Sequence, residues 1–106
     1  MNVENLFSNI PKKFPEEILE TLHENKNFKL ERIISSGQST PAGKWFDQEK
    51  DEWVLLLKGK AGLRFENESE VIELTPGDHL VIPAHKKHRV EWTDRTQTTV
   101  WLALHY

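Results

Sequence analysis

Short runs in which apolar and polar residues alternate, separated by turn residues, follow one another from Phe28 to the end of the chain. Alternation with a period of two is typical of a β-strand that buries one face. Gly59 ends one run, and Pro76-Gly77 has the residue order of a tight turn. We therefore predict an all-β sandwich or barrel of about seven strands. They span residues 28–35, 52–58, 61–67, 70–74, 78–83, 88–92 and 98–106.

The beginning of the chain has a different pattern. In "PEEILETLHEN", Pro15 stands where a helix commonly begins, and two glutamates follow it in the first turn. Ile18 and Leu22 contribute to one apolar face, as in a short amphipathic helix. We therefore expect residues 1–27 to be a helical extension that packs on a single barrel domain, residues 28–106.

Two of the predicted strands are apolar on both faces. They are the run Trp53–Leu57 and the last strand, residues 98–106. One face of each belongs to the barrel interior, and the other also needs a cover. A second sheet, the N-terminal helix or a second copy of the chain could provide it. We expect a homodimer, with a helix lid as the alternative.

Composition narrows the class of partner. The chain has 106 residues, enough for one core, and its net charge of −3 argues against a nucleic-acid partner. It has no cysteine, which excludes disulfides and thiolate ligands. No long apolar segment or leader pattern is present, so we expect no membrane span and no signal peptide. We expect a cytoplasmic protein whose partner is a small molecule.

Two residues are candidates for chemistry inside the barrel. In "HRVEW", strand parity places His88, Val90 and Trp92 on one face and two charged residues on the other. His88 then points inward, as a ligand or general base or as a core histidine with one hydrogen bond. Glu52 shares the parity of apolar residues in its strand. It is either a carboxylate at the barrel mouth or a solvated end of the acidic loop "DQEKDE".

Other polar and aromatic residues have two readings each. Asp47 and Gln48 either supply oxygen ligands from the loop before the strand or cap a turn. His85 lies three residues before the inward histidine, and the turn between them could bring both to one side. His79 and His105 are interpreted as structural or surface residues. The four tryptophans either line a pocket for a planar ligand or fill the core.

About half of the chain resembles the small single-domain cupins. Their first motif ends in a glutamate and, after six residues, a glycine, which matches Glu52 and Gly59 in "EWVLLLKG". In their second motif a glycine is followed by five residues, a proline, a second glycine position and then a histidine. "GDHLVIPAHKKH" matches this motif at Gly77, Pro83 and His88.

The resemblance fails at the two histidines of the first motif. Depending on the register, their positions hold Trp45 and Asp47 or Phe46 and Gln48. In the second motif His85 replaces the second glycine. The arrangement "WFDQ…E" resembles a cupin subgroup of unknown function. In that subgroup the Asp-Gln pair and this extra histidine look like replacements for the missing ligands.

The resemblance implies a fold and a kind of site. Cupins are jelly-roll barrels, or double-stranded β-helices, that commonly hold a metal ion with three histidines and a glutamate. The chain is therefore expected to hold a divalent Fe, Mn or Zn ion at the barrel mouth. The implied ligands are Asp47, Gln48, Glu52, His85 and His88.

Three functions agree with these expectations. The leading hypothesis is a small-molecule metalloenzyme, such as a dioxygenase or an isomerase. The alternative is a metal-free module that binds or senses a small ligand, and a third is a dimeric scaffold without pocket chemistry. The sequence leaves open whether the chain is an enzyme, because one barrel supports many reactions.

Overall fold

The computed structural model describes all 106 residues and consists of eight strands without a helix. The structure contains no helix that is long and apolar enough to cross a membrane. Seven strands match the seven predicted segments to within a few residues. The strands are β1 (Ile18–Glu24), β2 (Lys29–Ser35), β3 (Glu52–Lys58), β4 (Ala61–Phe65), β5 (Ile72–Leu74), β6 (His79–Ile82), β7 (His88–Thr93) and β8 (Thr99–His105).

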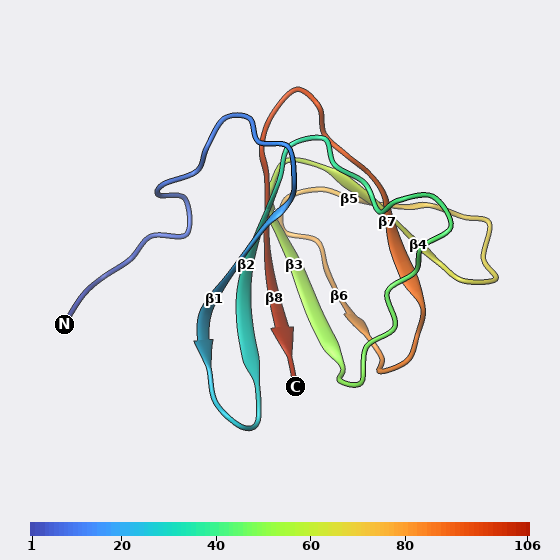
Figure 1. Cartoon of the computed structure of the whole chain (residues 1–106), viewed down its shortest axis with the longest axis horizontal. Coiled ribbons are helices and arrows are strands. Elements are labelled where there is room, and N and C mark those ends of the chain that lie inside the picture. Colours follow the sequence, from blue (N-terminus) through green and yellow to red (C-terminus); the bar gives the residue numbers. More distant parts are fainter.

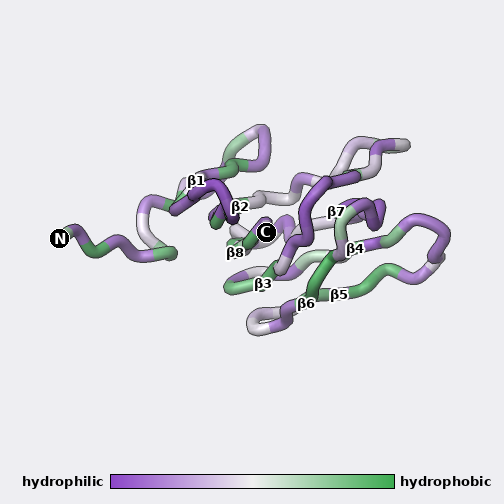
Figure 2. Tube along the Cα trace, turned by 90° about the horizontal axis from the view of Figure 1, so that it is seen from below, coloured by the Kyte–Doolittle hydropathy of each residue, from purple (hydrophilic) through white to green (hydrophobic).

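The strands form two sheets that face each other, which confirms the predicted all-β jelly-roll barrel. The larger sheet has the order β1-β2-β8-β3-β6, and the smaller one has the order β5-β4-β7 (Figures 1 and 2). All neighbouring strands are antiparallel. The last strand, β8, lies between β2 and β3, so the pairing brings together segments that are far apart in the sequence.

The predicted N-terminal helix is wrong, because its residues form the edge strand β1. Ile18 pairs with Ile34 and Glu20 with Arg32 of β2. The spacing of Ile18 and Leu22 fits a strand as well as a helix, since an even spacing keeps both on one strand face. An isolated helix of this length is marginally stable, whereas the open edge of β2 offers a full ladder of backbone partners.

Residues 1–17 have no regular structure but contact the sheet through Arg32. The buried Arg32 guanidinium donates hydrogen bonds to the carbonyl oxygens of Leu6 and Ser8, each 2.8 Å long. It also donates to Glu20 Oε2 at 2.7 Å. Arg32 therefore joins the N-terminal segment to β1 and β2.

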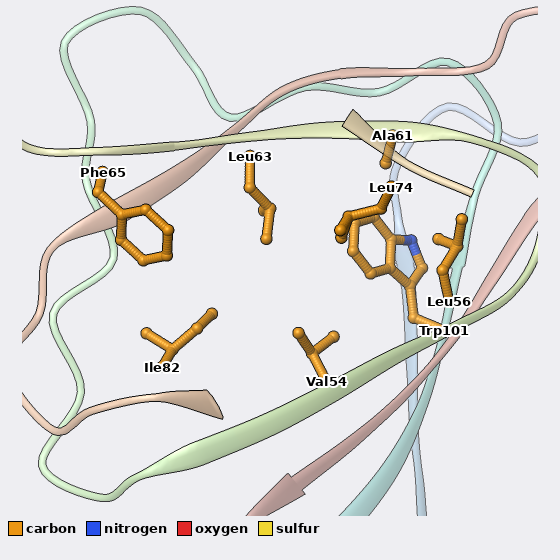
Figure 3. Packing of buried hydrophobic residues seen from close by; sticks show 8 residues of the cluster. All are labelled: Val54, Leu56, Ala61, Leu63, Phe65, Leu74, Ile82 and Trp101. Atoms are coloured by element: carbon orange, nitrogen blue, oxygen red, sulfur yellow. The ribbon is translucent and has the colours of Figure 1, made fainter. Parts of the chain in front are cut away.

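The apolar core lies between the two sheets (Figure 3). On β3, Glu52, Val54 and Leu56 are buried while the residues between them are half-buried, as the alternation predicts. Val54, Leu56 and Trp101 from the larger sheet face Leu63 from the smaller one in a single cluster. Because Glu52 begins the buried row of β3, the core places its carboxylate inside the barrel.

Trp92 does not point inward as its parity predicts, and 37% of its surface is exposed. The β4–β7 pairing shifts register between Gly62 and Leu63, so Gly62 pairs with Trp92 and Leu63 with Val90. This bulge moves Trp92 to the outer face, since one extra residue reverses the alternation. Its indole covers Gly62, where a Cβ atom would collide with the ring.

Candidate functional site

A small cavity of about 90 Å³ opens between the two sheets at the mouth of the barrel. Its walls come from both sheets and from the loop before β3. Eight of the 14 lining residues are hydrophobic, which keeps most of the wall apolar and concentrates the polar groups. The polar lining residues are Glu17, Glu31, Gln48, Glu52, His88 and His105.

Glu52 and His88 face each other across this cavity. Glu52 begins β3 and His88 begins β7, so each sheet contributes one of them. Glu52 Oε1 lies 3.6 Å from His88 Nε2, and only 8% and 6% of the two side chains are exposed. His88 points inward as expected, and of the two alternatives for Glu52 the structure has the carboxylate at the barrel mouth, where it has a nitrogen partner.

The backbone orients the His88 ring. Its Nδ1 lies 2.9 Å from the carbonyl oxygen of Lys86, which directs Nε2 toward Glu52 and the cavity. Burial alone would lower the pKa of His88, but the facing Glu52 carboxylate and the Lys86 carbonyl outweigh it and raise the pKa. The pocket thus favours a cation at the place that Nε2 and the carboxylate share.

Gln48 also lines the cavity, with a polar atom that is not used elsewhere. Its Oε1 is buried and has no hydrogen-bond partner. An unpaired buried carbonyl oxygen is unfavourable by about 1–3 kcal/mol, so such an atom usually has a function or a partner. Gln48 therefore adds a third donor atom to Glu52 and His88.

Asp47 and His85 lie outside the cavity, although the resemblance implies that they are metal ligands. Asp47 Oδ1 lies 2.9 Å from His85 Nδ1, and 43% and 66% of the two side chains are exposed. The amide of His85 donates to the carbonyl oxygen of Gln48 at 2.8 Å. The loop therefore directs Asp47 toward solvent and its neighbour Gln48 into the barrel, and the structure does not bring all five implied ligands together.

A second carboxylate–histidine pair, Glu31 and His105, lies in the same cavity. Glu31 Oε1 is 2.7 Å from His105 Nε2, and both side chains are largely buried. His105 is the direct cross-strand neighbour of Glu52. The interpretation of His105 as a structural or surface residue overlooked its position in the cavity. Its parity, shared with Trp101, was the signal that could have found it.

Glu17 is the third carboxylate of the cavity and was not predicted as a site residue. Ser35 Oγ donates to Glu17 Oε2 at 2.8 Å, and the indole of Trp101 donates to Ser35 Oγ at 3.2 Å. Burial raises the pKa of Glu17, the Ser35 hydrogen bond opposes this, and the charges of Glu31 and Glu52 add to the rise. Glu17 directly precedes β1. The helix prediction was wrong for this segment, so it did not indicate that Glu17 lies beside the sheet.

Only one of the four tryptophans lines the cavity, and that is Trp101. Trp45 lies outside, where the guanidinium groups of Arg64 and Arg89 are 5.2 and 5.8 Å from its ring centroid. The structure also contains no group of three or more His, Cys, Asp or Glu side chains placed to hold one metal ion. The donors that share the cavity wall include the Glu52 carboxylate, the His88 imidazole and the unpaired amide oxygen of Gln48.

The comparisons with known proteins agree with this architecture. A family model described as "Cupin domain" matches residues 33–105. A putative mannose-6-phosphate isomerase from Ralstonia eutropha JMP134 is 47% identical, with a TM-score of 0.95 over 99% of this chain and 97% of that one. No curated protein matches this sequence.

More distant structures share the fold. An RmlC-like cupin from Desulfovibrio desulfuricans is 23% identical, with a TM-score of 0.75 over 99% of this chain and 96% of that one. A cupin superfamily protein from Desulfitobacterium hafniense DCB-2 is 22% identical, with a TM-score of 0.74 over 91% and 82%. The family match over most of the sequence, together with the jelly-roll barrel and its pocket, shows that the chain belongs to the cupin family.

Proposed function

We propose that Gln48, Glu52 and His88 bind a divalent metal ion and that the chain uses this ion to act on a small molecule in the same pocket. The observation that carries the proposal is that three donor side chains, from the loop, β3 and β7, line one small cavity. Glu52 and His88 are nearly fully buried, and Gln48 Oε1 is buried without a partner. A metal ion would satisfy all three groups at once.

The spacing of these donors suits metal binding. Two ligands at about 2.1 Å from one ion, the usual distance for carboxylate oxygen or imidazole nitrogen, are separated by about 3–3.6 Å. Glu52 Oε1 and His88 Nε2 are 3.6 Å apart. The Lys86 carbonyl holds the other ring nitrogen of His88, as outer partners of metal-binding histidines commonly do. Mixed oxygen and nitrogen donors favour Fe, Mn or Zn.

Isomerisation by proton transfer is the reaction class that the pocket supports best. A divalent ion supplies Lewis acidity, which polarises a substrate oxygen. The chain itself contributes Glu31 and His105, which can hold or move a proton at His105 Nε2 and Glu31 Oε1. The apolar wall excludes water. The name of the 47% identical relative, a putative isomerase, supports the same class.

A metal-free binding module is the second candidate. It is favoured by the absence of a cluster of three charged or imidazole ligands and by the outward position of Asp47 and His85. In this case the same cavity groups would hydrogen-bond a small ligand directly. Asp47 and His85 would become metal ligands only if their loop rearranged, and the metal proposal does not require them.

Metal content, measured by elemental mass spectrometry on tag-free protein, separates the two candidates. The parent is expected to contain near-stoichiometric metal after purification or after exposure to Fe(II), Mn(II) and Zn(II). Glu52→Leu and His88→Phe should lose it, while Asp47→Leu and His85→Phe, the matched changes in the exposed pair, should retain it. A parent that takes up no metal under any of these conditions would contradict the metal proposal.

We further propose that the outer face of the larger sheet is covered by a second copy of the chain. Trp53 and Leu55 of β3 and Leu102 and Leu104 of β8 lie on this face and are only half-buried. Val81 of β6 lies beside Trp53 and is 51% exposed. Light scattering should give a dimer for the parent and a monomer for Leu104→Glu. A monomeric parent would contradict this proposal.

A further inference from the structure

The cavity contains three carboxylates, Glu17, Glu31 and Glu52, and no lysine or arginine lines it. Two of the three already have a cationic or imidazole partner. Glu52 faces His88, and Glu31 is paired with His105. Glu17 has no salt-bridge partner, and the metal proposal does not use it.

Glu17 is held in place for a partner that the chain does not provide. Ser35 Oγ donates to one carboxylate oxygen, and the Trp101 indole in turn donates to Ser35. Ser35 and Trp101 are both buried, so the position of the carboxylate is well defined. Burial raises the pKa of Glu17 by more than the Ser35 hydrogen bond lowers it, so the ionised form is only partly compensated.

Glu17 also lies where the cavity meets a groove on the surface. This groove has a volume of about 280 Å³ and shares Glu17, Phe46 and Val90 with the cavity wall. Glu16 adds a second carboxylate to the groove, which again contains no lysine or arginine. Carboxylates along the path into a site attract cationic ligands and raise their local concentration.

We infer that the pocket takes a small organic cation, such as a primary amine, whose ammonium group binds Glu17 beside Trp101 while the rest of the molecule lies in the groove. The cavity is large enough for such a group, and the aromatic surface of Trp101 adds a favourable environment for it. This inference rests on the proposed function, because it names the substrate class of the same pocket.

A phosphorylated sugar fits this lining poorly. The name of the 47% identical relative contains mannose-6-phosphate, whose phosphate is anionic. Phosphate sites in proteins are usually built from arginine, lysine or backbone amides at a helix N-terminus. This cavity and its groove contain neither cationic side chain, and the structure has no helix. Glu17, which has no cationic partner, and Glu16 in the groove would repel a phosphate placed beside them.

The test uses four probes and the full-length chain as purified. Isothermal titration calorimetry measures the Kd of n-butylammonium, of 1-butanol, of butyrate and of inorganic phosphate in the same buffer. We expect butylammonium to bind at least about tenfold more tightly than the other three, because a charged hydrogen bond is worth about 1.5–3 kcal/mol. Glu17→Gln should remove most of this preference, while Glu49→Gln, at an exposed position outside both pockets, should not.

Three outcomes would overturn the inference. They are no measurable binding of butylammonium, binding of butyrate or phosphate that is as tight, and a Glu17→Gln variant with the parental Kd. Circular dichroism and the melting temperature of each variant establish that it is folded. Metal content is measured on the same samples, so that loss of cation selectivity with metal still bound contradicts only this inference.

Discussion

Two of the three carboxylate–histidine pairs at the barrel mouth lie a few residues apart in the sequence, and they differ in a way that distance alone hides. Asp47 and His85 are 2.9 Å apart but largely exposed. Glu52 and His88 are 3.6 Å apart and almost completely buried. The closer pair lies in water, where screening makes such a contact worth only about 0–1 kcal/mol. The buried pair is the one with functional potential.

The two pairs also use their atoms differently. In the exposed pair the carboxylate and the imidazole are directed at each other, and the pair lies outside the cavity at the barrel mouth. In the buried pair the carboxylate and His88 Nε2 share a cavity wall with a third donor, Gln48 Oε1. A pair that keeps free lone pairs inside a largely apolar pocket can bind a further group. The comparison teaches that burial and lone pairs without a hydrogen bond identify a site better than a short distance between two side chains does.

The largest expected difference between the pairs is in stability. His88→Ala leaves the Glu52 carboxylate buried without a partner, which should lower the free energy of unfolding by about 3–5 kcal/mol. His85→Ala should change it by no more than about 1 kcal/mol. Urea denaturation of metal-free protein at neutral pH measures both. Equal losses in the two variants would remove the basis of the comparison.

Gln48 tests whether the buried pair forms a metal site. Gln48→Leu removes the unpaired Oε1, so the metal-free variant should be as stable as the parent or more stable. Its metal affinity should fall by about tenfold, because one ligand is lost. Competition with a chromogenic chelator measures this affinity. A variant with unchanged metal affinity would show that Gln48 is not a ligand.

Glu17 provides a pocket carboxylate without a histidine partner, and its effect should depend on pH. Burial raises the folded-state pKa of Glu17 above 4.5, the ordinary value of a glutamate side chain. Its favourable contribution is therefore present below that value and is lost as the pH rises through the folded-state pKa. Glu17→Gln should be more stable than the parent at pH 7, and the difference should disappear at about pH 4. Melting curves at both pH values test this, and a pH-independent difference would contradict it.

The smallest effect is expected for Asp47→Asn. Because Asp47 and His85 are exposed, the substitution should change stability by less than about 1 kcal/mol, and salt should reduce even that. Metal content should remain that of the parent. Loss of metal in this variant would show that the loop turns Asp47 inward when a metal binds, and would restore Asp47 as a ligand.

Much of the fold could be predicted from local patterns. Alternation along β7 correctly placed His88 inside the barrel, because side-chain direction in a strand depends on residue parity. For Glu52 the alternation along β3 offered the inward position as one of two alternatives, and the structure has that one. The same rule misplaced Trp92, because a bulge between Val90 and Trp92 reversed the parity. Parity can be counted along a sequence, whereas a bulge depends on how two strands pair.

The sequence itself determined seven of the eight strands, the two-sided apolarity of β3 and β8 and the inward orientation of His88, since each follows from a period of two within one segment. Tertiary structure alone decided that Ile18–Glu24 is a strand, because the open edge of β2 offered hydrogen bonds that a short helix could not match. It also decided that Glu17, Glu31 and His105 share a cavity with Glu52 and His88. These residues lie far apart in the sequence. The pairing of β8 between β2 and β3 brings Glu31, His105 and Glu52 together, and the facing smaller sheet contributes His88.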